Sequence, residues 1–189
     1  MHRIIIVFFI FLVSCGHNRD EVESVNQNLI IALIEKCILA DSLNYHGFID
    51  SELQHYEYYE LEFTDKGISY PPPQGSQWLN ETTIVEQLEE PQYFDDSVTR
   101  QYLKSQIINS KKIVNKVNLS SLGDDKLGVK FQNDESWYIF YLPIFNADSS
   151  AVYVQYDYFD SGYEEGKAAI FLKNNKQWEY TKFILRWMR

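Results

Sequence analysis

The sequence from Ala151 to Phe159 reads AVYVQYDYF, and this segment decides the fold class. Its even-numbered positions hold only Val and Tyr, whereas its odd-numbered positions include the polar residues Gln155 and Asp157. A period of two residues predicts a β-strand with one buried face and one partly wet face. We therefore expect a sheet whose strands lie mostly in the C-terminal third of the chain.

The residues around this segment extend the prediction to four strands. Fifteen of the thirty aromatic residues lie between Trp137 and Trp187, among Val, Ile and Thr, which favours strands throughout the region. Turn-forming residues separate the strands at 146–150, at 160–162 and at Asn174-Asn175, where Asn tolerates the positive φ of a two-residue type I′ turn. The pattern predicts an antiparallel meander of four strands, Trp137–Phe145, Ala151–Phe159, Lys167–Lys173 and Trp178–Trp187.

The part of the chain that precedes the meander has helical periodicity. Apolar residues recur at steps of three and four from Ser24 to Leu43, which predicts an amphipathic helix with Asp20 or Ser24 as its N-cap. Cys37 lies on the apolar stripe, so we expect it to be buried rather than reactive. Glu81–Glu90 and Ser97–Ser110 are predicted to be short helices, the second capped by Asp95 or Asp96.

Two stretches between these helices are less regular. Tyr56–Phe63 alternates imperfectly and is compatible with a strand or with the end of a helix. Pro71-Pro72-Pro73-Gln74-Gly75-Ser76 is predicted to be an extended connector. We therefore predict one α+β domain over residues 24–189, in which a helical part, 24–115, packs on one face of a β-meander, 126–189.

The N-terminus has the pattern of a signal sequence. A basic start, Met1-His2-Arg3, precedes an unbroken apolar run from Ile4 to Val13, followed by small residues. A helix of that length spans only ~15 Å, about half of a bilayer core. Leu12-Val13-Ser14-Cys15 resembles the lipobox of bacterial lipoproteins.

The lipobox resemblance implies how the chain is processed and where it is located. It implies that residues 1–14 are removed and that the Cys15 sulfur carries a lipid that holds residues 15–23 as a tether to the membrane. Gly16 follows the cysteine, which implies the outer membrane by the sorting pattern of enteric bacteria. Arg19-Asp20-Glu21 is similar to the charged cluster of some lipoproteins exported to the surface. We expect a membrane-anchored protein of the bacterial cell envelope.

The C-terminal half resembles small lipoproteins of unknown activity that are common in Bacteroidetes. The resemblance rests on Pro143-Ile144-Phe145-Asn146 with Asp148 two residues later, on the turn glycines Gly162 and Gly166, and on Lys173-Asn174-Asn175-Lys176 followed by Trp178 and Trp187. Gln101-Tyr102-Leu103 resembles a segment that lies upstream in those proteins. Many of them place two cysteines beside the turn glycines, and this chain has none there. The resemblance implies a fold and a location, and no activity.

Charge and motifs limit the classes of function. The formal net charge is −10, which argues against general binding to nucleic acid or to anionic lipid head groups. The sequence contains no Gly-rich phosphate loop, nucleophile elbow or zinc-protease helix, and we expect no cofactor. Two cysteines cannot form a disulfide scaffold or a zinc cluster.

Two groups of residues are weak candidates for chemistry. Asp157, Asp160, Glu164 and Glu165 place four carboxylates within nine residues, which could hold a hard cation such as calcium in the expected loop 157–165. His46 and His55, with Asp50 and Glu52 between them, could form a metal or acid–base cluster. A solvated acidic turn and surface histidines are the alternatives to these two sites.

Two functional hypotheses remain from the sequence. The first is a non-enzymatic binding or interaction domain of the envelope, for example an inhibitor of immunity type that meets a toxin with a basic cleft. Its partner is a protein or a small ligand. The second is a hydrolase or metal-dependent enzyme that uses the His46/His55 region or the acidic loop. We favour the first, because no residue pattern specifies a reaction.

Overall fold

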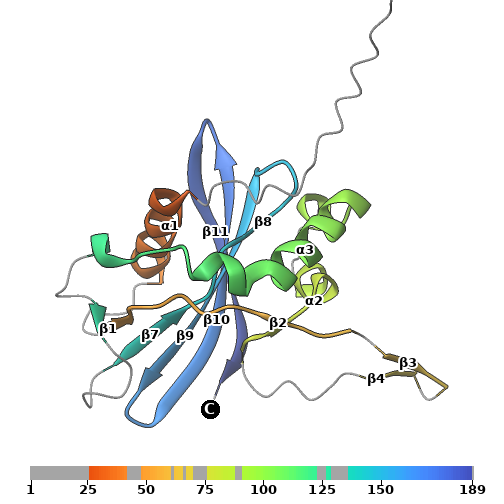
Figure 1. Cartoon of the computed structure of the whole chain (residues 1–189), viewed down its shortest axis with the longest axis horizontal. Coiled ribbons are helices and arrows are strands. Elements are labelled where there is room, and N and C mark those ends of the chain that lie inside the picture. Colours follow the sequence, from red (N-terminus) through yellow and green to blue (C-terminus); the bar gives the residue numbers. More distant parts are fainter. Residues whose placement is uncertain are drawn as a thin grey trace, which may run out of the picture.

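Three long antiparallel strands form one side of the main sheet in the computed structural model (Figure 1). They are β9, Ala151–Asp160, β10, Tyr163–Asn174, and β11, Gln177–Met188. The structure describes residues 26–41, 48–60, 62–65, 67–69, 76–87, 91–122, 127–128 and 136–188. The predicted signal peptide, Cys15 and the tether lie outside these residues. The α+β class predicted from the sequence is confirmed.

The predicted strand Trp137–Phe145 is divided in two. β7, Trp137–Phe140, and β8, Ile144–Phe145, both pair with β9 in antiparallel fashion. Pro143 lies between them and has no N–H to donate to a neighbouring strand. The N–H of Leu142 donates to the carbonyl of Gln54 over 3.0 Å instead of to β9. A proline and a change of partner therefore interrupt what the sequence pattern presents as one strand.

The two hairpin turns lie close to the predicted positions. Ser161 and Gly162 join β9 to β10, and the φ of +86° at Gly162 is one that glycine adopts readily. β10 consequently begins at Tyr163 and not at Lys167. Asn175 and Lys176 join β10 to β11 with φ of +47° and +69°, as a type I′ turn requires. The turn type is as predicted, but the turn lies one residue later than Asn174-Asn175.

The sheet is mixed rather than a pure antiparallel meander. β1, Phe48–Asp50, pairs in parallel with β7, and β6, Leu127–Gly128, pairs in parallel with β1. The strand order is β11-β10-β9-β7-β1-β6, and β8 adds a seventh strand beside β9. The sequence therefore predicted too few strands, and it placed all of them in the C-terminal third of the chain.

The part predicted as helical, 24–115, also contains short strands. Besides β1 it holds two small two-stranded sheets, one formed by β2 with β5 and one by β3 with β4. Tyr56–Phe63 thus contributes strands and not the end of a helix. A strand of two or three residues has too few positions to show a period, which is why the sequence pattern missed them. The bounds of these strands are Glu57–Tyr58 (β2), Glu62–Thr64 (β3), Gly67–Ser69 (β4) and Trp78–Leu79 (β5).

The predicted helices form, with changed ends. α1 spans Gln27–Ala40 and is capped by Asn26, whose Oδ1 accepts from the N–H of Leu29 over 3.2 Å. The prediction of Asp20 or Ser24 as the cap was wrong, because the helix begins later than the apolar periodicity suggests. The other helices are α2, Glu81–Gln87, α3, Ser97–Val114, and the 3-10 turns η1, Pro91–Tyr93, and η2, Ser120–Leu122.

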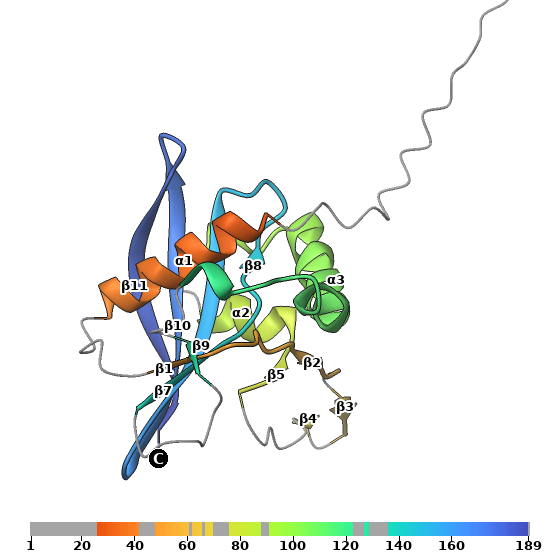
Figure 2. The same cartoon turned by 60° about the vertical axis from the view of Figure 1, so that its left-hand side comes forward.

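Helices cover both faces of the sheet, whereas the sequence suggested one. Asp41 caps α1 and accepts a hydrogen bond of 2.6 Å from the Tyr156 hydroxyl. Ser110 of α3 bonds to the backbone of Tyr56, whose ring stacks on Tyr141 at 5.2 Å. Tyr141 lies opposite Gln155, the neighbour of Tyr156, and successive side chains of a strand point to opposite faces. Figure 2 shows α1 lying across the long strands and α3 apart from it.

Cys37 is 0% exposed inside the core, as predicted. β11 is the edge strand, and two of its residues, Thr181 and Arg186, are inserted relative to the register with β10. Such insertions are β-bulges, which bend a strand and increase its twist. The long edge of the sheet is therefore irregular.

Candidate functional site

The four carboxylates proposed as cation ligands do not converge. Asp157 and Asp160 belong to β9, and Glu164 and Glu165 belong to β10, so that the expected loop 157–165 is mostly strand. Glu164 lies opposite Phe159, on the face of Asp157, whereas Glu165 lies opposite Tyr158, on the face of Asp160. The two pairs are thus on opposite sides of the sheet. Among the described residues no group of three or more His, Cys, Asp or Glu side chains is arranged to hold a metal ion.

Glu165 instead belongs to a buried ion cluster with Asp41 and Lys167. The Lys167 ammonium lies 2.6 Å from Glu165 Oε1 and 3.1 Å from Asp41 Oδ1. Burial lowers the pKa of Lys167, but hydrogen bonds to Glu165 and Asp41 outweigh burial and raise its pKa above the ordinary value. Tyr156 and Tyr163 donate to the two carboxylates. The cluster fixes the end of α1 to the sheet.

Asp157 takes part in a second network, on the opposite face. The Tyr141 hydroxyl donates to Asp157 Oδ2 over 2.9 Å, and burial, followed by the charge of Asp157, raises the pKa of Tyr141. The Gln155 amide donates to the carbonyl of Ser76 over 2.6 Å, and the Trp187 indole N–H donates to the Ser76 hydroxyl. These bonds hold the residues before β5 against the sheet, which is a structural role.

His55 does not join Asp50 or Glu52. Its Nε2 lies 3.1 Å from Glu57 Oε1, and Asp50 Oδ1 accepts from the backbone N–H of Glu52 over 3.1 Å. His46 lies outside the described residues. The part of the proposed histidine cluster that is described is thus a partly exposed pair between His55 and Glu57.

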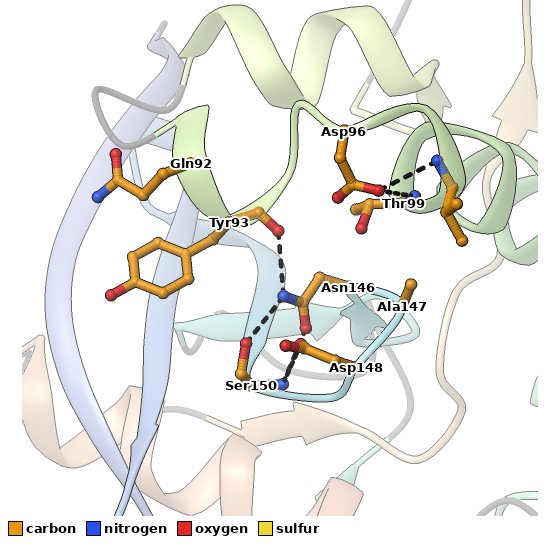
Figure 3. A pocket seen from close by; sticks show the side chains of 9 residues that line it. Gln92, Tyr93, Asp96, Thr99, Asn146, Ala147, Asp148 and Ser150 are labelled. Carbon is orange, nitrogen blue, oxygen red and sulfur yellow. Dashed lines mark hydrogen bonds between the residues drawn. The ribbon is translucent and has the colours of Figure 1, made fainter.

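A surface pocket that the sequence did not indicate is the strongest candidate site. It has a volume of about 350 Å³ and lies between η1, the first turn of α3 and the turn between β8 and β9 (Figure 3). Asn146, 3% exposed, fixes this geometry, since its amide donates to the Tyr93 carbonyl and to the Ser150 hydroxyl, both at 3.0 Å. Its Oδ1 accepts from the N–H groups of Ser150 and Ala151. The pocket is therefore built on a rigid turn.

Two carboxylates line this pocket from opposite sides. Asp96 comes from the start of α3 and Asp148 from the turn, as Figure 3 shows. Hydrogen bonds from the hydroxyl and N–H of Thr99 lower the pKa of Asp96, and those from the hydroxyl and N–H of Ser150 lower the pKa of Asp148. Both are therefore ionised at neutral pH, and neither has an ion-pair partner within the described part of the chain.

This arrangement attracts cations. The pocket presents two negative charges, hydroxyl and amide groups, and the exposed apolar side chain of Val98. A guanidinium or ammonium group is the natural complement of two such carboxylates. From the sequence, Asp96 was predicted as a helix cap, and Asp148 as part of a turn and of the motif that resembles small lipoproteins. No local signal places these two residues together, since a contact between distant turns is a property of the fold.

Comparisons of the chain with protein-family models, with curated proteins and with solved structures find no match. The resemblance to small Bacteroidetes lipoproteins consequently stays a prediction. Within the described residues, no helix has the length and apolarity needed to cross a membrane.

Proposed function

We propose that the protein is a lipid-anchored protein of the bacterial cell envelope that binds a positively charged partner protein without transforming it. Leu12-Val13-Ser14-Cys15, which resembles a lipobox, supports the anchor. The acidic pocket supports the binding role. The observation that carries the proposal is that Asp96 and Asp148, both ionised and both without a cation among the described residues, face one rigid pocket.

The partner is a protein that inserts a lysine or arginine side chain into this pocket. An aliphatic stem would pack beside Val98, and the charged head would lie between the two carboxylates. The net charge of −10 would speed the encounter with a basic surface. A toxin with a basic cleft is one class of partner that fits this chemistry.

The anchor is tested by fractionation of cells that produce Cys15→Ala. We expect this variant to be lost from the membrane or left unprocessed, while a Cys37→Ala control remains anchored. Retention of Cys15→Ala in the membrane at the level of the unchanged protein would contradict the lipid anchor.

The pocket is tested by capture of partners from the source cells with the variant Asp96→Asn, Asp148→Asn. Asn removes the charge but keeps the oxygen that accepts from the N–H groups of Val98, Thr99 and Ser150, so that the local fold is preserved. The matched control is Glu52→Gln, Glu86→Gln, which removes two exposed charges elsewhere. We expect a stoichiometric basic partner that is lost at high salt and in the first variant only. Equal capture by both variants would refute the site.

A further inference from the structure

The charge of the chain is distributed unevenly along the sequence. Residues 97–116, which include α3, contain five basic residues and no acidic residue. The chain as a whole has 17 basic and 27 acidic residues, so the remainder carries 12 basic residues against 27 acidic ones. A net charge of −10 therefore conceals a positive segment, which can attract an anionic surface that the chain as a whole would repel.

The cations of this segment differ in their surroundings. Arg100 pairs with Asp95, and Lys104 pairs with Glu60 at 3.6 Å. Lys111, Lys112 and Lys116, which we term the basic patch, are exposed and make no ion pair with any residue that the structure describes. Lysines in the last turn of a helix also stabilise that helix, because their positive charge lies at the negative end of the helix dipole. Lys116 lies beyond the end of α3, so the dipole does not account for the whole patch.

The basic patch lies beside the point where the tether reaches the domain. Gln27, the first residue of α1, donates from its side-chain amide to the carbonyl of Asn118 over 2.7 Å. Asn118 follows Lys116 by two residues. The α1 cap, Asn26, is 11 residues after Cys15, and 11 residues span at most ~40 Å when extended. A lipid at Cys15 would consequently keep this end of the domain close to the bilayer.

We propose that the basic patch contacts anionic phospholipid head groups and so orients the anchored domain on its membrane. The proposal rests on the proposed anchor at Cys15. Each lysine near an anionic membrane surface strengthens attachment about fivefold. α3 has 18 residues and is therefore about 27 Å long, with the acidic pocket at its start and the patch at its end. Contact through the patch directs the pocket away from the bilayer, toward an arriving partner.

The test measures the distance of two sites from the membrane in the lipidated full-length protein. A fluorophore is attached to Asn115→Cys, beside the patch, or to Gln177→Cys, in the β10–β11 hairpin, which projects away from α3 (Figure 1). Cys37 is 0% exposed and does not compete for the label. The protein is reconstituted in vesicles with one part anionic phosphatidylglycerol to two parts neutral lipid, some of which carries a head-group quencher.

We expect the label at position 115 to be quenched at least twice as strongly as the label at position 177. The difference should vanish in Lys111→Glu, Lys116→Glu, in vesicles without anionic lipid and at high salt. The matched control, Lys36→Glu, Lys173→Glu, has the same change of charge on exposed residues outside the patch and should keep the difference. Equal quenching at the two positions, or a difference that survives the patch substitutions, would overturn the proposal.

A failure of the anchor is recognised separately, by the mass of the purified protein. If the protein carries no lipid at Cys15, the proposed anchor fails, and co-sedimentation of the same protein with the anionic vesicles tests the patch. Sedimentation at low salt that is lost in Lys111→Glu, Lys116→Glu would support the patch. No sedimentation would overturn it.

Discussion

Removal of the Lys167 ammonium is expected to be among the most destabilising single changes in the sheet. In Lys167→Met the side chains of Asp41 and Glu165, only 9% and 5% exposed, lose the cation that lies between them. Leaving a buried charge without its partner costs about 3–5 kcal/mol. For a chain of this length, the melting temperature should fall by about 6–20 °C.

The assay is urea unfolding of the unchanged and the variant protein, followed by circular dichroism. We expect a lower midpoint with an unchanged slope, because the surface exposed on unfolding stays nearly the same. Lys173→Met, which removes an exposed lysine from the same strand, should cost less than about 0.5 kcal/mol. Adding Asp41→Asn and Glu165→Gln to Lys167→Met should restore much of the lost stability, since none of the three side chains in the cluster then carries a charge. A cost below about 1 kcal/mol for Lys167→Met would show that the cluster behaves as an exposed ion pair and would refute the reasoning.

Two further predictions concern buried hydroxyl groups. Ser110→Ala should lower the free energy of unfolding by about 1–3 kcal/mol, because the N–H of Tyr56 then lacks the buried oxygen that accepts its hydrogen bond. An unchanged midpoint in urea unfolding would contradict this role. The pKa values of Tyr56, Tyr141, Tyr153 and Tyr156 are raised, mainly by burial, so folding favours the neutral forms of these side chains. The stability that results is present below about pH 10 and is lost as the pH rises further. When the pH is raised, the phenolate absorbance of these four tyrosines should appear only as the circular dichroism signal of the fold is lost. Ionisation of these tyrosines in a protein that is still folded would contradict the prediction.

The parts of the fold that could be predicted from the sequence are those with local signals. The period of two residues in the sequence correctly predicted the strand β9, although the expected wet face is buried as well, with Gln155 0% and Asp157 5% exposed. The turn at Asn175 and Lys176 contains a residue type that tolerates positive φ. The cap at Asp96 is another local signal, since its side chain accepts from the N–H groups of Val98 and Thr99, two and three residues later. Each of these features depends on residues that are neighbours in the chain.

The parts that could not be predicted depend on contacts between distant residues. β1 has only three residues, and its place between β7 and β6 comes from parallel pairing that leaves no local pattern. Asp41 and Lys167 are 126 residues apart in the chain, and each looks like an ordinary surface charge in the sequence. The same holds for the acidic pocket, where Asn146 fixes the turn to η1 and Gln106 of α3 bonds to the backbone of Phe145, so that a helix cap and a turn residue line one pocket.

The irregular edge of the sheet would have a consequence at a membrane if the proposed anchor at Cys15 holds the protein there. Copies anchored to one bilayer diffuse in two dimensions and collide often, and a straight strand of 12 residues at a sheet edge would invite a second copy to continue the sheet. The insertions at Thr181 and Arg186 interrupt any such register, and Lys182 adds a charge between them. β11 is therefore a poor template for a second copy of the chain, and this protection would matter most at the high local concentration that the proposed anchor would produce.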